Sequence, residues 1–165
     1  MTAEDTPPRF SEAALGEYRT ILGRYPERRA ALMPTLWLAQ REFGWLSEPV
    51  QRYVAELMEL PFAWVTSVTS FYTMYWTRKP GRHHLQVCRN LSCALRGSLA
   101  IRDAISERLG IRDGEQTADG TFSLEEVECL ASCGTAPVIQ VSNGPYHENL
   151  TVESALALVE RLARE

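Results

Sequence analysis

All four cysteines of the chain lie in two short stretches, LQVCRNLSCALRG at residues 85–97 and VECLASCGTAPVIQV at residues 127–141. They form two pairs, separated by four and by three residues, Cys88-x4-Cys93 and Cys129-x3-Cys133. The first pair begins where one predicted strand ends, and the second pair flanks the loop between the next two predicted strands. Two loops that meet at one edge of a sheet could present four thiolates to a single centre. These cysteines are therefore the candidate site residues.

Four cysteines in two loops suit more than one chemistry. Four thiolates can hold a structural zinc ion or an iron–sulfur cluster, and buried cysteines can also bind nothing. Structural zinc sites commonly place two residues between paired cysteines, and neither pair has that spacing. A plant-type ferredoxin run would need a cysteine at position 96, where the sequence has Arg96. The spacing thus favours an iron–sulfur cluster over zinc and leaves both open.

The residues around the cysteine pairs follow a strand pattern interrupted by turns. Alternating apolar residues predict three strands, at residues 83–87, 121–128 and 137–141. The dipeptide Asn143-Gly144, just before Tyr146, is a strong hairpin signal and predicts a further short strand after the turn.

Helices are predicted between and after these strands. A helix over residues 97–109 is expected to point three apolar side chains inward, Leu99, Ile105 and Leu109. Thr151 can cap a last helix. The resulting order of strands and helices predicts a small open α/β sheet for residues 81–165.

The first half of the chain has helical periodicity throughout. Apolar residues at helical spacing predict four amphipathic helices: one from Phe10 to Leu22, one from Leu32 to Phe43, one capped by Ser47 and one that begins at Pro61 and is lined as far as Tyr75. Residues 1–80 are therefore expected to form a small helical bundle. With the sheet of residues 81–165, this predicts an α+β protein of two domains.

Charge and aromatic content argue against a DNA-binding function for the bundle. The chain has 17 basic and 21 acidic residues, a formal charge of −4. The predicted fourth helix, the candidate recognition helix of a redox-sensing transcription factor, contains no arginine or lysine for phosphate contacts. This lack of basic side chains predicts no nucleic-acid partner. Residues 1–80 instead contain 13 of the 15 aromatic side chains, which favours docking of a protein partner.

The sequence shows no targeting segment and no membrane span. Its start lacks a basic region followed by an apolar run, and no uncharged apolar run approaches the roughly 20 residues that cross a bilayer. We therefore expect a cytoplasmic protein without direct membrane insertion. Thiols stay reduced in that compartment, which disfavours disulfides.

Together the two cysteine stretches resemble the thioredoxin-like [2Fe–2S] ferredoxin family, and within it the E subunits of bacterial NADH-quinone oxidoreductase (respiratory complex I). The resemblance extends upstream to five short segments: YP at 25–26, ALMP at 31–34, AQ at 39–40, FGW at 43–45 and SFYTMY at 70–75. It covers nearly the whole chain from about Phe10. One departure is Ala131, because the family usually has glycine at that place.

The resemblance implies an oxidoreductase subunit that carries electrons and has no catalytic residue of its own. It implies a thioredoxin-like domain that holds one [2Fe–2S] cluster on Cys88, Cys93, Cys129 and Cys133. The partner subunit would bind FMN and NADH and dock on the helical bundle, with other subunits of the peripheral arm nearby. The complex would hold the chain at the periphery of the inner membrane.

Two alternatives accompany this interpretation. The chain could be the equivalent subunit of a soluble NAD-linked formate dehydrogenase or hydrogenase. It could also be a zinc-stabilised scaffold protein that only joins other subunits.

A cluster held by four thiolates is negatively charged and needs donors and cations around it. Backbone amides of residues 132–136, including that of Gly134, are the candidate donors. Arg89 and Arg96 are the candidate cations, which would favour the reduced state and raise the reduction potential. The alternative is that both arginines are solvated surface residues. The three histidines are expected not to be ligands: His83, His84 and His147.

Overall fold

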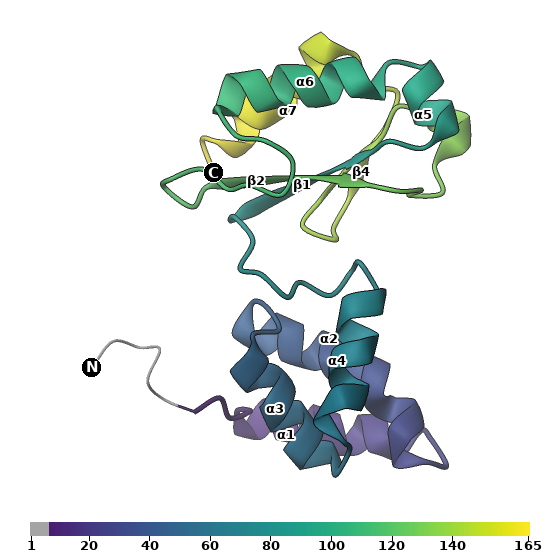
Figure 1. Ribbon diagram of the computed structural model, residues 1–165, viewed down its shortest axis with the longest axis vertical. Helices are drawn as coiled ribbons and strands as arrows, with labels where there is room; N and C mark the ends of the chain where they lie inside the picture. The colour runs from purple at the N-terminus through teal and green to yellow at the C-terminus, as the bar shows by residue number, and fades with distance from the viewer. Residues whose placement is uncertain (1–6) are drawn as a thin grey trace. The chain divides into compact units, whose positions relative to one another are not determined.

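The computed structural model describes residues 7–165 (Figure 1). Contacts divide the chain into two compact units, Met1–Lys79 and Pro80–Glu165. Along the described residues, no helix is both long and apolar enough to span a membrane. The expectation that the chain starts without a leader falls in part on residues 1–6, which lie outside the described part.

Residues 7–79 of the first unit form four α-helices and one short 3-10 helix: α1 Glu12–Leu22, η2 Arg28–Ala31, α2 Leu32–Phe43, α3 Glu48–Met58 and α4 Phe62–Phe71. Serine side chains cap the starts of two of these helices. Ser11 accepts a hydrogen bond from the Ala14 amide at the start of α1, and Ser47 accepts one from the Val50 amide at the start of α3. Apolar side chains from all four α-helices form one core, and each fully buried Leu, Met or Val contributes about 1.5–3 kcal/mol.

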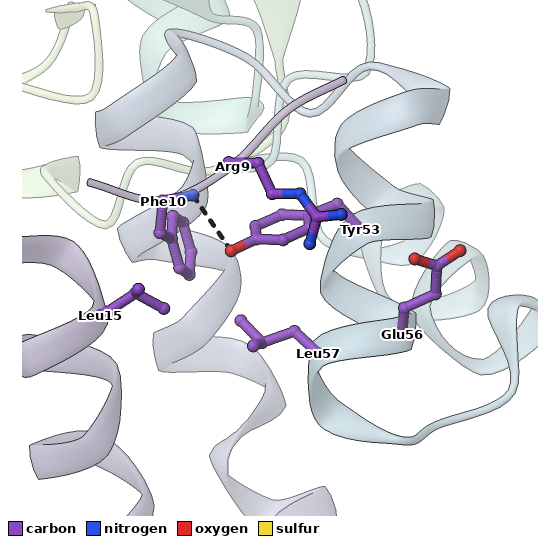
Figure 2. Close-up of a pocket in the computed structure, with 6 residues that line it drawn as sticks. All are labelled: Arg9, Phe10, Leu15, Tyr53, Glu56 and Leu57. Atoms are coloured by element: carbon purple, nitrogen blue, oxygen red, sulfur yellow. Dashed lines mark hydrogen bonds between the residues drawn. The ribbon is translucent and has the colours of Figure 1, made fainter. Parts of the chain in front are cut away.

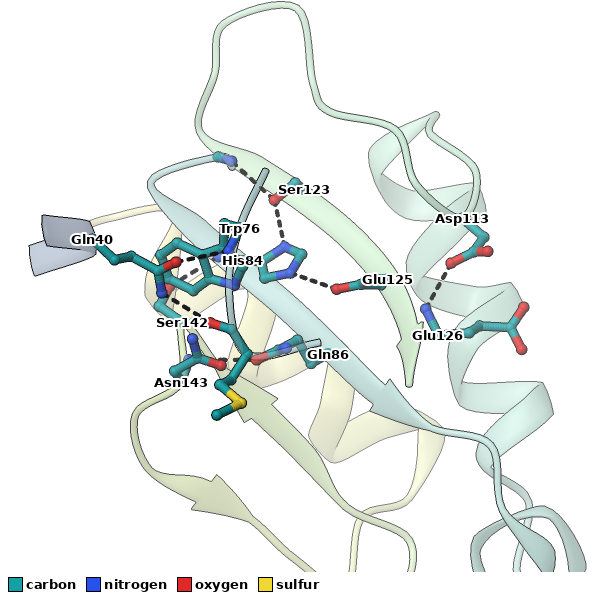
Figure 3. Close-up of polar contacts among 12 residues, drawn as sticks. Gln40, Trp76, His84, Gln86, Asp113, Ser123, Glu125, Glu126, Ser142 and Asn143 are labelled. Atoms are coloured by element: carbon teal, nitrogen blue, oxygen red, sulfur yellow. Dashed lines mark hydrogen bonds and ion pairs between the residues drawn. The ribbon is translucent and has the colours of Figure 1, made fainter. Parts of the chain in front are cut away.

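The fourth helix is shorter than the sequence predicts. It ends at Phe71, because Tyr72 is extended (φ −94°, ψ 113°), and Tyr75 lies in the following segment. The side chain of Gln40 holds that segment by donating to the Met74 carbonyl (2.9 Å) and accepting from the Trp76 amide (2.7 Å) (Figure 3). The Gln40 side chain of α2 therefore satisfies two backbone groups of this segment that a further helical turn would otherwise have satisfied.

Residues 80–165 alternate strands and helices around one mixed sheet. The elements are β1 His83–Cys88, α5 Leu91–Leu95, α6 Ser98–Leu109, β2 Phe122–Val127, η3 Cys133–Thr135, β3 Ile139–Val141, β4 Tyr146–His147 and α7 Val152–Leu162. The strand order is β2-β1-β3-β4. Strands β1 and β2 are parallel, with Cys88 opposite Val127, and the β1/β3 and β3/β4 pairs are antiparallel. This is the open mixed sheet that the sequence predicts.

Helices α6 and α7 lie together on one face of the sheet (Figure 1). Their apolar side chains pack on Leu85 and Val87 of β1 and on Leu124 of β2. Leu99, expected to face inward, is 44% exposed. The buried residues of α6 are Ser98, Ile101 and Ile105, so the prediction is confirmed for Ile105. Leu99 follows Ser98 by about 100° around the helix and therefore points away from the sheet.

A polar chain ties β1 to β2. The His84 ring bonds to the Ser123 hydroxyl through Nδ1 (2.7 Å) and to Glu125 through Nε2 (2.9 Å) (Figure 3). The Ser123 hydroxyl also accepts the amide of Gly81 (2.9 Å). Only glycine fits at residue 81, because a Cβ there would lie 2.4 Å from the Phe122 backbone. These contacts fix the pairing of the two strands that lead to the cysteine loops.

Candidate metal centre

The first cysteine pair spans the end of β1 and a short helix. Cys88 is the last residue of β1, and its amide donates to the Val138 carbonyl at 3.2 Å. Asn90 then begins α5 by accepting the Leu91 amide with its side chain (2.7 Å), and α5 contains Cys93. Both cysteines are 2% exposed. The sequence predicts a loop here, although an asparagine three residues before Cys93 is a possible helix cap.

The second pair lies after β2 and is exposed. Cys129 follows the strand by two residues, and Cys133 begins η3. Between them the backbone of Ala131 adopts the left-handed conformation (φ 60°). This turn directs the Ala131 amide toward the Cys129 sulfur at 3.3 Å and leaves the sulfurs of Cys129 and Cys133 3.8 Å apart.

The two pairs meet at one edge of the sheet. The Cys88 thiol donates to the Glu128 carbonyl, next to Cys129, at 3.0 Å. Cys88 and Cys93 pack in a small cluster with residues between β2 and β3, Leu130, Ala136 and Val138. All four cysteines are free of disulfides. The fold therefore brings together the four residues that the sequence singled out.

The thiols influence one another electrostatically. Burial and the neighbouring Cys88 thiol raise the pKa of Cys93 to about 11. The pKa of Cys133 is also raised, first by the Cys129 thiol beside it. Thiolates crowded in this way repel each other, and a bound cationic centre would remove that repulsion. The four thiols are consequently better suited to binding one metal centre together than to remaining separate and unbound.

The spacing of the sulfurs is close to that of thiolate coordination. A sulfur–sulfur separation of 3.8 Å is close to the edge of a tetrahedron whose metal–sulfur distance is about 2.3 Å. Within residues 7–165, no group of three or more His, Cys, Asp or Glu side chains is arranged to hold one metal ion. The thiols approach as two pairs, Cys88 with Cys93 and Cys129 with Cys133. In a [2Fe–2S] cluster four cysteines serve two irons, and these residues fit such a group.

The two candidate cations make different contacts. Arg89 forms an ion pair with the Glu128 carboxylate, and both side chains are exposed. Arg96 donates through Nε to the Ala136 carbonyl at 2.7 Å and so connects the end of α5 with the loop after Cys133. Arg96 therefore joins the two cysteine loops, whereas the charge of Arg89 is balanced by its neighbour.

The expected amide donors are only partly available. The Thr135 amide donates to the Ser132 carbonyl at 3.1 Å, inside the loop itself. Two amides outside the expected segment 132–136 contact a sulfur: that of Ala131 donates to Cys129, and that of Val138 donates to Cys93. The sequence offered one signal for this turn: residue 131 is a place where the family usually has glycine, which adopts the left-handed conformation easily.

The acidic run on β2 makes structural contacts. Glu125 bonds to His84, as described above, and Glu126 forms an ion pair with Arg102. The Glu126 amide also donates to the Asp113 carboxylate at 2.6 Å (Figure 3). These carboxylates hold the sheet and its flanking segments together.

The first unit contains a pocket of about 320 Å³ (Figure 2). The Phe10 amide donates to the Tyr53 hydroxyl at 3.0 Å, and the Arg9 guanidinium lies 5.8 Å from the centre of the Tyr53 ring. The lining residues are Arg9, Phe10, Leu15, Tyr53, Glu56 and Leu57. The Phe10 amide and the Tyr53 hydroxyl of the lining already bond to each other, and the lining includes no cysteine.

Comparison with known proteins identifies the family. The family model of the thioredoxin-like [2Fe–2S] ferredoxins matches residues 18–163. The second of the NADH-quinone oxidoreductase E subunits of Rhizobium meliloti is 46% identical over 144 residues, which are 87% of this chain and 85% of that protein. The NADH-quinone oxidoreductase E subunit of Rickettsia bellii is 40% identical over the full length of both chains.

A solved structure shares the fold. An NAD+-reducing [NiFe]-hydrogenase in the air-oxidized state superposes with a TM-score of 0.70 at 21% sequence identity. The match covers 81% of this chain and 23% of the hydrogenase chain. At this identity the likeness concerns the fold alone.

Proposed function

Since the chain belongs to the thioredoxin-like [2Fe–2S] ferredoxin family, we propose that it is the electron-transferring E subunit of NADH-quinone oxidoreductase. We assign one [2Fe–2S] cluster to four ligands, Cys88, Cys93, Cys129 and Cys133. When bound, such a cluster supplies one-electron transfer. Hydride chemistry with NADH and FMN then belongs to the partner subunit.

The observation that carries this proposal is the meeting of two cysteine loops at one sheet edge. Buried Cys88 and Cys93 give the site a rigid inner side, and exposed Cys129 and Cys133 leave its outer side open toward a partner. Electron transfer to a second protein requires such an open side, whereas a purely structural site can be closed. The relatives at 40% and 46% identity favour the quinone reductase over a soluble dehydrogenase or hydrogenase.

We assign partner docking to the helical bundle of the first unit. Its second and fourth helices and the residue after α4 expose large aromatic side chains, namely Trp37, Trp64, Phe71 and Tyr72. Phe71 is the most exposed of them, at 77%. Aromatic side chains of this size are common hot spots of protein interfaces. The partner proposed for this aromatic surface is the subunit that binds FMN and NADH, and through that complex the chain would lie at the periphery of the inner membrane.

Co-purification from the native host tests the assignment to an enzyme. A tagged chain is expected to bring down an FMN-containing protein that oxidises NADH, together with other subunits of a quinone reductase. Recovery of a formate dehydrogenase or a hydrogenase in its place would support that alternative and contradict the proposal. A zinc-containing chain without a flavoprotein would support the scaffold interpretation.

A further inference from the structure

The second cysteine loop is held by the carboxylate of Glu148, which follows β4. Its Oε1 accepts the hydroxyl of Thr135 at 2.5 Å and also the hydroxyl of Ser132. The two hydroxyl oxygens are 2.7 Å apart. Ser132 directly precedes Cys133, and Thr135 is the last residue of η3, which Cys133 begins. One carboxylate oxygen therefore contacts the loop on both sides of a candidate ligand.

Backbone hydrogen bonds continue the same attachment. The Asn149 amide donates to the Thr135 carbonyl at 2.7 Å, and the Leu150 amide donates to the Pro137 carbonyl at 3.2 Å. The next residue, Thr151, begins α7 with a capping box. The cysteine loop is thus tied to the start of a well-capped helix that packs on the sheet.

The two cysteine pairs are held by different forces. Cys88 and Cys93 are buried in an apolar cluster, which fixes them by packing. Cys129 and Cys133 are exposed and cannot be fixed in that way. Polar contacts must then define the position of the second pair, and those of Glu148 are side-chain contacts that flank Cys133.

We propose that Glu148 is a positioning residue for electron transfer, which orients the second cysteine pair through the hydroxyls of Ser132 and Thr135. That Cys129 and Cys133 are ligands rests on the proposed function. The attachment of their loop to Glu148 rests only on contacts within this chain. Glu148 acts on the cysteines through its two hydroxyl partners.

The charge of Glu148 is consistent with this role. The hydroxyls of Ser132 and Thr135 hold the pKa of the Glu148 carboxyl below its ordinary value. The group is therefore ionised at neutral pH and can accept both hydrogens. A negative charge beside this loop also disfavours addition of an electron nearby, so it should lower the reduction potential.

Three variants separate positioning from charge. Glu148→Ala removes the acceptor and the charge, and Glu148→Gln removes the charge but keeps a carbonyl acceptor. The double variant Ser132→Ala/Thr135→Ala removes the donors and keeps the charge. Glu107→Gln on α6 is the matched control, since it removes one carboxylate from the same unit and leaves the loop contacts intact.

Measurements on two forms of the full chain, cluster-free and loaded, give the outcome. Hydrogen exchange of residues 129–136 is measured in cluster-free protein, and the rate of cluster loss to a chelator, the EPR spectrum and the midpoint potential are measured in loaded protein. Glu148→Ala and the double variant are expected to accelerate both exchange and cluster loss by about tenfold. Glu148→Gln should have a smaller effect on these rates and shift the potential to a more positive value.

Wild-type rates in both Glu148→Ala and the double variant, or equal effects from Glu107→Gln, would overturn the proposal. If the wild-type chain holds no cluster, the proposed function fails, but hydrogen exchange in cluster-free protein still decides the role of Glu148. In that case faster exchange in the two variants supports the attachment of the loop by Glu148, and unchanged exchange rejects that attachment.

Discussion

The backbone of Ala131 has a positive φ angle of 60° in the loop between Cys129 and Cys133. This conformation costs a residue with a Cβ about 1–2 kcal/mol, and glycine does not have that cost. The turn also points the Ala131 amide at the Cys129 sulfur. The family's usual glycine at this place therefore has a conformational reason, and this chain keeps the turn in spite of its alanine.

We expect Ala131→Gly to increase the free energy of unfolding by up to about 1 kcal/mol, because strain is relieved at the cost of some chain entropy. Urea unfolding of the reduced, cluster-free chain measures the change. The control is Ala104→Gly inside α6, which should decrease stability by about 0.5–1 kcal/mol. A decrease of the same size for both variants would refute the conformational argument.

Single serine substitutions test each candidate ligand. Cys88→Ser, Cys93→Ser, Cys129→Ser and Cys133→Ser should each bleach or shift the visible spectrum, because an alcohol is a poor substitute for a thiolate. Absorption and EPR spectra of anaerobically purified variants measure this. A variant with the wild-type spectrum would show that its cysteine is not a ligand.

At the scale of elements, α5 and the residue after it link the two cysteine pairs. The helix contains Cys93, and Arg96 donates from its end to the Ala136 carbonyl of the other loop. A charge-assisted hydrogen bond of this kind fixes a distance between two loops that no strand pairing fixes. The Arg96 charge also favours the reduced state of a negative centre nearby.

Arg96→Ala should accelerate cluster loss and shift the midpoint potential to a more negative value. The lost hydrogen bond corresponds to about 1 kcal/mol. Arg96→Lys keeps the positive charge, so its midpoint potential should lie between those of the wild type and Arg96→Ala. Lysine lacks the planar guanidinium and should not restore the fixed hydrogen-bond geometry to Ala136. Potentiometric titration measures the shift, with Arg108→Ala on α6, which pairs with Glu160, as the control. An equal shift in both alanine variants would argue against a specific role for Arg96.

Much of this fold could be predicted from local sequence. Ser47 and Thr151 cap helices as expected, and the turn at Asn143-Gly144 joins two strands, because these signals depend on neighbouring residues alone. Helix α5 was missed because five residues give no periodicity. The contacts of Glu148 with Ser132 and Thr135 span 13 to 16 residues and follow from tertiary packing, which no local pattern contains.

At the scale of the whole molecule, the chain has two units with separate cores, to which we assign two different tasks. The second unit, Pro80–Glu165, has its own apolar core and all four cysteines. The first unit has a separate core and the exposed aromatic surface. A unit with its own core can fold alone, so holding a cluster and docking a partner should be separable.

A chain limited to residues 80–165 is therefore expected to keep its visible absorption and to bind the flavin subunit poorly. In the full chain, Phe71→Ala should weaken that binding by about tenfold or more, as for an interface hot spot. Affinity measurement with the purified partner tests both, and Tyr146→Ala, at an exposed aromatic of the second unit, is the control. Full affinity of the short chain would refute docking through the bundle.

The four thiols of this chain are assigned to one [2Fe–2S] cluster, and analysis of anaerobically purified protein tests that assignment most directly. We predict a coloured protein with equimolar iron and acid-labile sulfide, and an EPR signal that appears on one-electron reduction. A colourless protein that contains zinc and no acid-labile sulfide would contradict it.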